Sequence, residues 1–402
     1  MLVIKTLKEK KIKILFTCIL VVVLHACVEP YNFKSETYER LLVVEATITD
    51  EEKTQEIYLS NVYRIDNDTI IPESNARVLV VDDNQNEYEF RETQPGKYTS
   101  INEFNISSGK KYHLEILTSN GRNYISEEET LPENNAVMEN LYAERTTNDE
   151  GIEGIAIYNS SANPGQDGVS YYKYSYKETY KIVSPYTSNR NLIVTNSGAL
   201  QIVPKTKEEE ICYNTRRSKE ILLADTGALS ENEISDYLVK FYKFDDFPIQ
   251  NRYSILVNQI SVSQETYEYY ETLKELSGSE SIFSQNQPGF INGNISSVED
   301  SNEKVIGNFN LGKASSKRIF FNFKDFFNFS DNPNAGRSCE VTRPERFLDI
   351  VAFISTNQMK FYGEADGIPP NEEGAGPYRL VRTICMDCTV LGTNVKPEFW
   401  VD

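Results

Sequence analysis

Histidine is nearly absent from this chain of 402 residues, which contains only His25 and His113. His25 lies in an apolar N-terminal stretch, while His113 lies in the alternating segment 111–116, where we expect it to point to solvent. A single histidine in the body of the chain cannot form a multi-histidine metal site. It supports a Ser-His-acid or Cys-His arrangement only if His113 is itself the base. The sequence therefore argues against histidine-based hydrolysis, and we expect no bound metal and no cofactor.

Basic residues are scarce relative to acidic ones, with 41 Lys and Arg against 60 Asp and Glu and a formal net charge of −19. A chain this acidic repels phosphate backbones and anionic lipid, so we expect no nucleic-acid partner. Acidic clusters at 66–68 and 82–84 invite a calcium assignment, but neither has the glycine and distal glutamate of an EF-hand loop. Both fit turns better, because Asp and Asn favour turns through local hydrogen bonds.

The N-terminus combines a basic segment with a short apolar one. Five lysines between residues 5 and 13 precede an apolar stretch at 14–24, which ends in Leu24-His25-Ala26-Cys27. This order is typical of a bacterial secretory signal with a lipobox, whose peptidase cuts before the cysteine. The apolar stretch is too short to span a bilayer. We therefore predict a signal at 1–26, acylation of Cys27 by chains such as palmitate, and a polar tether at 27–40 that holds the protein on a membrane outside the cytoplasm.

Cysteine is rare beyond this signal, where only Cys212, Cys339, Cys385 and Cys388 occur besides Cys27. An even number in an exported chain indicates two disulfides, because that compartment is oxidising. Two alternatives stay open: a four-thiolate zinc site that uses the close spacing of Cys385 and Cys388, and a thioredoxin-like redox pair. Zinc would favour a second close pair, and a redox motif would favour a βαβ pattern around it. We expect Cys385 and Cys388 each to bond to a distant partner.

Aromatic residues are abundant, with 25 Tyr and 20 Phe, although Trp occurs once and Met four times. Aromatic and β-branched residues favour strands. Residues 41–132 hold about seven short alternating segments between turn signals such as Asn120-Gly121, which fits an immunoglobulin-like β-sandwich. Gly109 and Tyr112, ahead of an alternating segment, resemble a tyrosine corner.

A linker at 131–135 leads to a larger region at 135–402, which we expect to be a β-rich domain with a few helical insertions. Two short helices are predicted: one at 231–241 after the cap Ser230, and one that follows the capping box of Ser261 and Gln264 and runs to Leu276. The predicted strands include 253–257, 293–296, 305–310, 318–323 and 347–354. The sequence thus indicates a mainly β protein of two domains.

Five aromatic residues are candidate contacts to a ligand or partner. Tyr172, Tyr174 and Tyr176 alternate with polar residues, so they form a tyrosine ladder on one face of a strand. Core packing is the favoured interpretation of this ladder and an exposed contact surface is the alternative, because tyrosine suits both. Tyr186 opens the polar stretch 184–207, and Trp400 is the only tryptophan. Ordinary packing is again the alternative for these two residues.

Several segments together resemble the Bacteroidota outer-membrane lipoproteins of domain of unknown function 4249. The resemblance rests on Cys27-Val28-Glu29-Pro30, residues 41–44, residues 253–262 with Tyr269-Tyr270, Gln287-Pro288, Gly293-Asn294-Ile295, residues 305–309, and the ending Cys385-Met386-Asp387-Cys388-Thr389 with Gly392 and residues 396–400. It implies an outer-membrane lipoprotein, often encoded beside TonB-dependent transporters whose plugs follow a carboxypeptidase-like domain. It brings no catalytic residues.

We therefore expect a non-enzymatic lipoprotein on the outer membrane, at the cell surface rather than the periplasmic face. Its expected role is to assist a TonB-dependent transporter, or another outer-membrane barrel, in nutrient uptake. Two alternatives stay open. One is a structural subunit of an envelope assembly, and the other is a glycoside hydrolase with paired carboxylates, for which no pair stands out from the acidic background.

Overall fold

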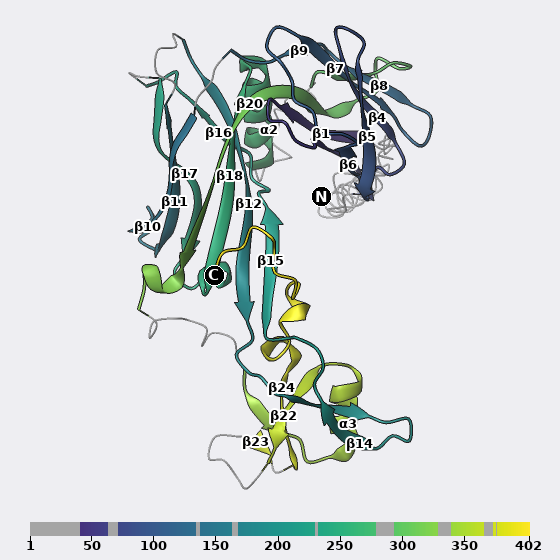
Figure 1. Cartoon of the computed structure of the whole chain (residues 1–402), viewed down its shortest axis with the longest axis vertical. Helices are drawn as coiled ribbons and strands as arrows, with labels where there is room; N and C mark the ends of the chain where they lie inside the picture. The colour runs from purple at the N-terminus through teal and green to yellow at the C-terminus, as the bar shows by residue number, and fades with distance from the viewer. Residues whose placement is uncertain are drawn as a thin grey trace, which may run out of the picture.

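A computed structural model describes residues 41–62, 71–133, 137–162, 168–229, 232–278, 293–328, 339–365, 373–374 and 376–402. The predicted signal, Cys27, the tether and the acidic cluster 66–68 lie outside these ranges. The described chain is mainly β, as the sequence predicts, and its strands form one long sheet and three smaller ones. Figure 1 shows an elongated molecule with the N-terminal strands at one end and a small module around helix α3 (Phe347–Ser355) at the other. Within the described ranges, no helix is long and apolar enough to cross a membrane.

The N-terminal part is a series of short antiparallel strands in the order β1-β2-β6-β5-β4-β7-β8. Alternate side chains of these strands are buried, and they form a core around Ile48, Ile57 and Leu114. The strand bounds are β1 (Leu41–Thr49), β2 (Glu56–Val62), β3 (Ile71–Pro72), β4 (Arg77–Asp82), β5 (Glu87–Gln94), β6 (Lys97–Ser100), β7 (Lys111–Leu117), β8 (Asn123–Ser126) and β9 (Glu129–Thr130).

Residues 41–132 do not form the complete N-terminal sheet. The first half of β20 (Val305–Asn322) lies parallel to β1, and β19 (Ile295–Ser297) pairs with β8. The N-terminal core therefore includes Phe309 and Leu311, which come from far along the chain. The short strands of the predicted sandwich are present, but strands beyond residue 290 complete their sheet.

The local turn signals of this part are confirmed. The chain turns at Asn120-Gly121 between β7 and β8, and Gly121 has a φ of +85°, which glycine adopts without steric cost. At the turn after β4, Asp82 accepts hydrogen bonds from two backbone N–H groups. The hydroxyl of Tyr112 accepts a hydrogen bond of 3.0 Å from the N–H of Ser107, which is the contact that defines a tyrosine corner.

The second part continues the same sheet with longer strands in the order β15-β12-β18-β20. Because β20 pairs with β1 through its first half and with β18 through its second, it joins the two parts, and the predicted strands 305–310 and 318–323 are one strand. Figure 1 shows the N-terminal strands projecting sideways from the upper end of these long strands. The bounds are β12 (Tyr171–Val183), β15 (Ile211–Arg217), β16 (Leu222–Asp225) and β18 (Arg252–Val262).

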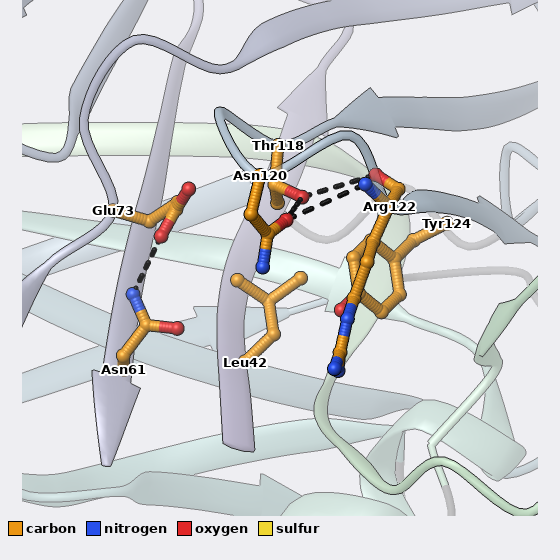
Figure 2. A pocket seen from close by; sticks show the side chains of 7 residues that line it. All are labelled: Leu42, Asn61, Glu73, Thr118, Asn120, Arg122 and Tyr124. Carbon is orange, nitrogen blue, oxygen red and sulfur yellow. Dashed lines mark hydrogen bonds between the residues drawn. The ribbon is translucent and has the colours of Figure 1, made fainter. Parts of the chain in front are cut away.

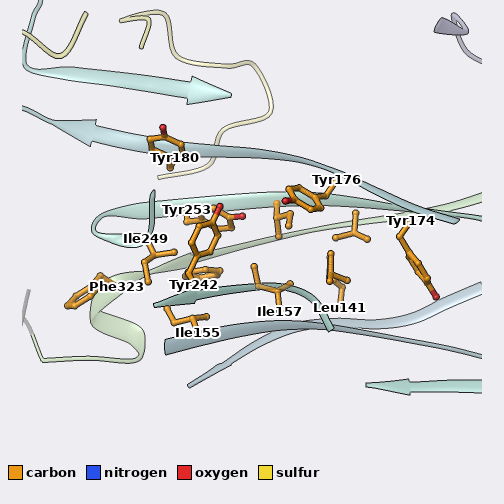
Figure 3. Packing of buried hydrophobic residues seen from close by; sticks show 14 of the residues in the cluster. Leu141, Ile155, Ile157, Tyr174, Tyr176, Tyr180, Tyr242, Ile249, Tyr253 and Phe323 are labelled. Atoms are coloured by element: carbon orange, nitrogen blue, oxygen red, sulfur yellow. The ribbon is translucent and has the colours of Figure 1, made fainter. Parts of the chain in front are cut away.

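A three-stranded sheet covers one face of the long strands and encloses the main core. Its strands are β10 (Val137–Thr147), β11 (Glu153–Ala162) and β17 (Glu233–Lys243), in the order β10-β11-β17. Aliphatic side chains such as Ile155 and Ile157 face tyrosines of the long sheet across this core (Figure 3). Its buried carboxylate, Glu178, accepts hydrogen bonds from the hydroxyls of Tyr242 and Tyr253.

The predicted helix at 231–241 is wrong, because its described residues belong to β17. The apolar residues Ile234, Leu238 and Phe241 have a helix-like spacing but do not share one buried face, since Ile234 is 5% exposed and Leu238 is 46% exposed. The strand is irregular. Its register shifts twice against β11, and Asp236 has a φ of +52°. Such bulges insert extra residues and break the alternation expected of a strand.

The second predicted helix is confirmed as α2 (Gln264–Gly278). The side chain that caps its first turn is Ser263 rather than Ser261, since the Ser263 hydroxyl accepts a hydrogen bond from the N–H of Thr266. The predicted strand at 347–354 is wrong, because these residues form α3. A short apolar run does not by itself distinguish a strand from a helix.

The distal module surrounds α3 with short elements. They are β13 (Arg190–Val194), β14 (Leu200–Pro204), β21 (Val341–Arg343), β22 (Met359–Glu364), β23 (Glu373–Gly374), β24 (Tyr378–Arg382) and the 3-10 turns η5 (Thr383–Cys385) and η6 (Cys388–Val390). Two further 3-10 turns, η1 (Phe247–Ile249) and η2 (Phe323–Asp325), lie near the lower end of the long strands.

Two disulfides fasten this module. Cys339 bonds to Cys385 within it, and Cys388 bonds to Cys212 of β15, 176 residues away in sequence. The prediction of two disulfides is confirmed, as is the expectation that Cys385 and Cys388 bond to distant partners rather than to each other.

Candidate interaction surface

The tyrosine ladder is not a contact surface. Tyr172, Tyr174 and Tyr176 have exposed fractions of 1, 2 and 4%, and all three belong to the core between the two sheets. Figure 3 shows Tyr174 and Tyr176 in this core. The ring of Tyr174 stacks on that of Tyr237 at 4.5 Å between centroids. Burial raises the pKa of Tyr176 to about 12. These three tyrosines are therefore core residues and not contact residues. Core packing was also the interpretation that the alternation of the strand favoured.

Trp400 and Tyr186 also pack inside the molecule. The indole of Trp400 is 4% exposed and lies edge-on to Tyr213 and Phe320, at 5.0 and 5.7 Å between centroids. Tyr186 is half-buried against Tyr362 at 5.1 Å. Trp400 thus fixes the C-terminal tail to the long sheet, and Tyr186 lies where that sheet meets the distal module. None of the five candidates belongs to a shared exposed surface.

A small polar hollow lies where the start of β1 and the end of β2 face the turn between β7 and β8 (Figure 2). Its volume of about 80 Å³ suits a few water molecules and is well below the several hundred Å³ of a typical ligand pocket. The hydrogen bond of 2.8 Å from Asn61 to Glu73 crosses one side. Arg122 on the other side is paired with Glu303 at 2.6 Å. The lining residues are Leu42, Asn61, Glu73, Thr118, Asn120, Arg122 and Tyr124.

His113 lies where the sequence places it, on the outer side of β7, with its Nε2 atom 3.2 Å from a carboxylate oxygen of Glu115. In the described ranges, no group of three or more His, Cys, Asp or Glu side chains is arranged so that it could hold a metal ion.

Among the residues that the structure describes, the clearest apolar surface without a covering neighbour is one face of α3. This helix is apolar at seven of the nine positions of Phe-Leu-Asp-Ile-Val-Ala-Phe-Ile-Ser, yet only Ile350 is fully buried. Phe347 and Leu348 are 51 and 69% exposed. Val351 and Ala352 follow them by one turn on the same side. An apolar helix is normally covered on all sides, so this exposed face is the candidate interaction site. We call Phe347, Leu348, Val351 and Ala352 the α3 face.

The opposite side of α3 holds the helix on the module. Ile350 packs with Leu192 of β13, Phe361 of β22 and Leu380 of β24, which are all at most 5% exposed. The side chains that cover Ile350 thus come from three strands, of which β13 is distant from α3 in sequence and β22 and β24 follow it. The exposed face therefore rests on a packed support rather than on a loose segment.

A buried ion network braces the junction between the module and the long sheet. Lys360 lies 3.0 Å from Glu209 and 2.9 Å from Asp387, and Lys205 lies 3.2 Å from the other oxygen of Glu209. Burial alone would lower the pKa of Lys360, but hydrogen bonds to Asp387 and Glu209 outweigh it and raise that pKa. In sequence, Asp387 lies between Cys385 and Cys388, each of which forms a disulfide with a distant cysteine. The ion network and the two disulfides therefore stabilise the same junction, which we call the joint.

Sequence reasoning missed the α3 face because it assigned these residues to a strand. The available signal was the density of large apolar residues in 347–354. A half-buried strand would alternate apolar with polar residues, and this segment does not. The signal shows an unusual apolar run, and only the tertiary structure shows which of its side chains stay uncovered.

Comparison with known proteins places most of the chain in one family. The model of the domain of unknown function DUF4249 matches residues 28–318. The match covers the N-terminal sheet and most of the long sheet, and it ends before α3 and before the C-terminal segments that also resemble this family. No curated protein matches the chain.

Proposed function

Since the chain belongs to the DUF4249 family, we propose that it is a lipoprotein of the outer membrane that assists a TonB-dependent transporter in nutrient uptake without catalysing a reaction. The α3 face is the observation that carries this proposal. A protein that acts through a partner needs an exposed surface that gains free energy when it is covered, and α3 offers one.

The gain can be estimated from the side chains. Full burial of a large apolar side chain contributes about 1.5 to 3 kcal/mol. Phe347 and Leu348 are about half and two thirds exposed, so corresponding fractions of that gain are still available to them. Large apolar side chains at the centre of an interface are the usual source of binding energy between proteins. The proposed partner surface is therefore apolar.

The reach of the proposed anchor is compatible with this role. Residues 27–40 would span at most about 50 Å if fully extended, at roughly 3.5 Å per residue. The α3 face lies at the far end of the molecule from the N-terminal strands (Figure 1). A protein held by such a tether could place its distal module against the exposed loops of a neighbouring barrel.

The test is affinity purification of the lipidated protein from membranes solubilised in mild detergent. We expect a TonB-dependent transporter to co-purify in a stable ratio. The double variant Phe347→Ser and Leu348→Ser should lose it, while Val298→Ser, which changes a side chain that is 62% exposed in the N-terminal part, should retain it. Recovery of a different envelope assembly would favour the structural-subunit alternative. Recovery of no outer-membrane protein would overturn the proposal.

A further inference from the structure

The outer face of the long sheet collects basic side chains in a protein that is otherwise acidic. Even-numbered residues of β12 point into the core, so its odd-numbered residues from Tyr171 to Val183 point outward. Strand pairing extends this face across β15, β18 and β20. The outward residues of the four paired strands include no Asp or Glu. They include six cations: Lys173, Lys177, Lys181, Arg217, Arg252 and Arg318.

Three of these cations lie in one row across the sheet. Arg217 of β15 pairs with Lys177 of β12, which pairs with Leu256 of β18, which pairs with Arg318 of β20. We call Arg217, Lys177 and Arg318 the basic row. Neighbouring strands are about 4.8 Å apart, so the row extends over about 14 Å.

Other elements cover the two ends of this face, and two members of the basic row lie between them. At the upper end α2 packs on the sheet, with Tyr267 beside Tyr171 and Tyr270 beneath the ammonium of Lys173 at 3.7 Å. At the lower end lies the C-terminal tail, whose Asp402 is 4.0 Å from Lys181. Lys177 and Arg217 lie between these two covers and are exposed.

The basic row is oriented by aromatic rings rather than neutralised by carboxylates. The guanidinium of Arg217 lies 3.9 Å from the ring centre of Tyr58, and that of Arg318 lies 3.7 Å from the ring centre of Phe399. Arg318 also donates a hydrogen bond of 3.0 Å to the hydroxyl of Ser254. Among the described residues, no carboxylate lies within 4 Å of any of the three cations. Burial without a counter-charge lowers the pKa of Arg318.

The nearest acidic residue on the facing strand is already engaged. Glu56 of β2 lies 2.8 Å from Lys97 and accepts a hydrogen bond of 2.5 Å from the hydroxyl of Tyr58. It fixes the ring that supports Arg217. Burial would raise the pKa of Glu56, but its hydrogen bonds with Lys97 and Tyr58 and the charges of Lys97 and Lys177 lower it, so Glu56 acts on Lys177 through space and not through an ion pair. Cations held side by side repel one another, and a bound anion would reduce this repulsion.

We propose that the basic row binds an elongated small molecule that carries at least two anionic groups, carboxylate or phosphate. Arg217 and Arg318 would hold one group at each end, because guanidinium binds both groups through paired hydrogen bonds. Lys177 would neutralise charge between them. The rings of Tyr58 and Phe399 would contact the apolar parts of the molecule beside each arginine. This inference does not depend on the α3 face or on a transporter.

The experiment is titration calorimetry on the full chain, with inorganic tripolyphosphate and citrate as the two probes at low and physiological salt. We expect saturable binding of at least one probe, weakened by salt because the contact is between charges. Binding of tripolyphosphate but not of citrate would identify phosphate as the recognised group. Binding of citrate but not of tripolyphosphate would identify carboxylate. Absence of saturable binding of both probes at low salt would overturn the proposal.

Two double variants with the same change in charge locate the site. Lys177→Gln with Arg217→Gln should weaken binding at least tenfold. Arg91→Gln with Lys243→Gln, which removes two exposed charges elsewhere, should change it less than twofold. Equal weakening by both pairs would show that only net charge matters and would overturn the assignment to this row. The single variant Lys177→Gln should weaken binding several-fold. Because this position is exposed, the variant should fold normally, so it tests the site even if the double variant fails to fold.

Discussion

Arg217, the last residue of β15, lies with its guanidinium 3.9 Å from the ring centre of Tyr58 in β2. These strands are separated by β12, β18, β20 and β1 in the order of the long sheet. The contact therefore crosses the angle that the N-terminal strands make with the long strands (Figure 1). The two parts are joined by the continuous backbone of β20 and also by this cation–π contact.

The first prediction concerns the strength of this contact. In a double-mutant cycle of Tyr58→Leu and Arg217→Gln, we expect a coupling free energy of about 0.5 to 1 kcal/mol, as for a partly exposed cation–π pair. Urea unfolding of the four proteins measures it. A cycle of Tyr58→Leu with Lys243→Gln, a distant exposed lysine of β17, should give no coupling. Equal values in the two cycles would refute the contact.

The second prediction concerns the disulfide that ties η6 to β15. Replacing Cys212 and Cys388 by serine should lower the free energy of unfolding by about 2 to 5 kcal/mol, because the bond restricts a long loop in the unfolded chain. The disulfide between Cys339 and Cys385 closes a shorter loop, with a sequence separation of 46 residues. Replacing these two cysteines by serine should therefore lower the free energy of unfolding by a smaller amount. Denaturant unfolding with and without reductant compares them. A larger loss for the shorter loop would contradict this order.

Local signals of the sequence predicted the N-terminal strands well. Asn120-Gly121 predicts the observed turn, and the Gly109–Tyr112 pattern predicts the observed tyrosine corner. Both signals depend on contacts between residues that are close in sequence. The disulfide partners were foreseen only in part, since four cysteines allow three pairings. The parallel pairing of β1 with the first half of β20 was not foreseen, because it joins residues more than 250 positions apart.

The candidate sites were harder to predict for the same reason. The cations of the basic row are ordinary strand residues in sequence, and only the register of four strands places Arg217, Lys177 and Arg318 side by side. A net charge of −19 predicts that nucleic acid and anionic lipid are poor partners. That prediction concerns the average of the surface, and it does not describe a face where the fold places several cations together.

The third prediction separates the two sides of α3. Ile350→Ala should lower the free energy of unfolding by about 2 to 4 kcal/mol, since it leaves a cavity in the support of the helix. Leu348→Ala should change it by less than about 0.5 kcal/mol, because that side chain is 69% exposed. Chemical unfolding of both variants is the measurement. A large cost for Leu348→Ala would mean that the α3 face packs within the protein and is not free for a partner.

The fourth prediction concerns the pH dependence of the joint at Asp387. Burial would raise the pKa of this carboxyl, but hydrogen bonds from Thr389 and Lys360 outweigh it and hold the pKa below the usual 3.8. A carboxyl whose pKa is lower in the folded state contributes stability above its unfolded pKa. That contribution disappears as the pH falls through the folded pKa. Lys360 has the opposite dependence, since its raised pKa sustains its contribution up to pH values above 10.5.

Asp387→Asn should therefore lower the free energy of unfolding by about 2 kcal/mol at pH 7, less than for a fully buried pair because Lys360 is partly exposed. The difference from the unmodified protein should shrink below pH 4, where the carboxyl begins to lose its charge. Urea unfolding at pH 7, 4 and 3 follows this change. Asp349→Asn is the matched control, because its ion pair with Arg346 is exposed and should contribute less than about 0.5 kcal/mol at pH 7. A difference for Asp387→Asn that stays constant with pH would assign its effect to packing and not to charge.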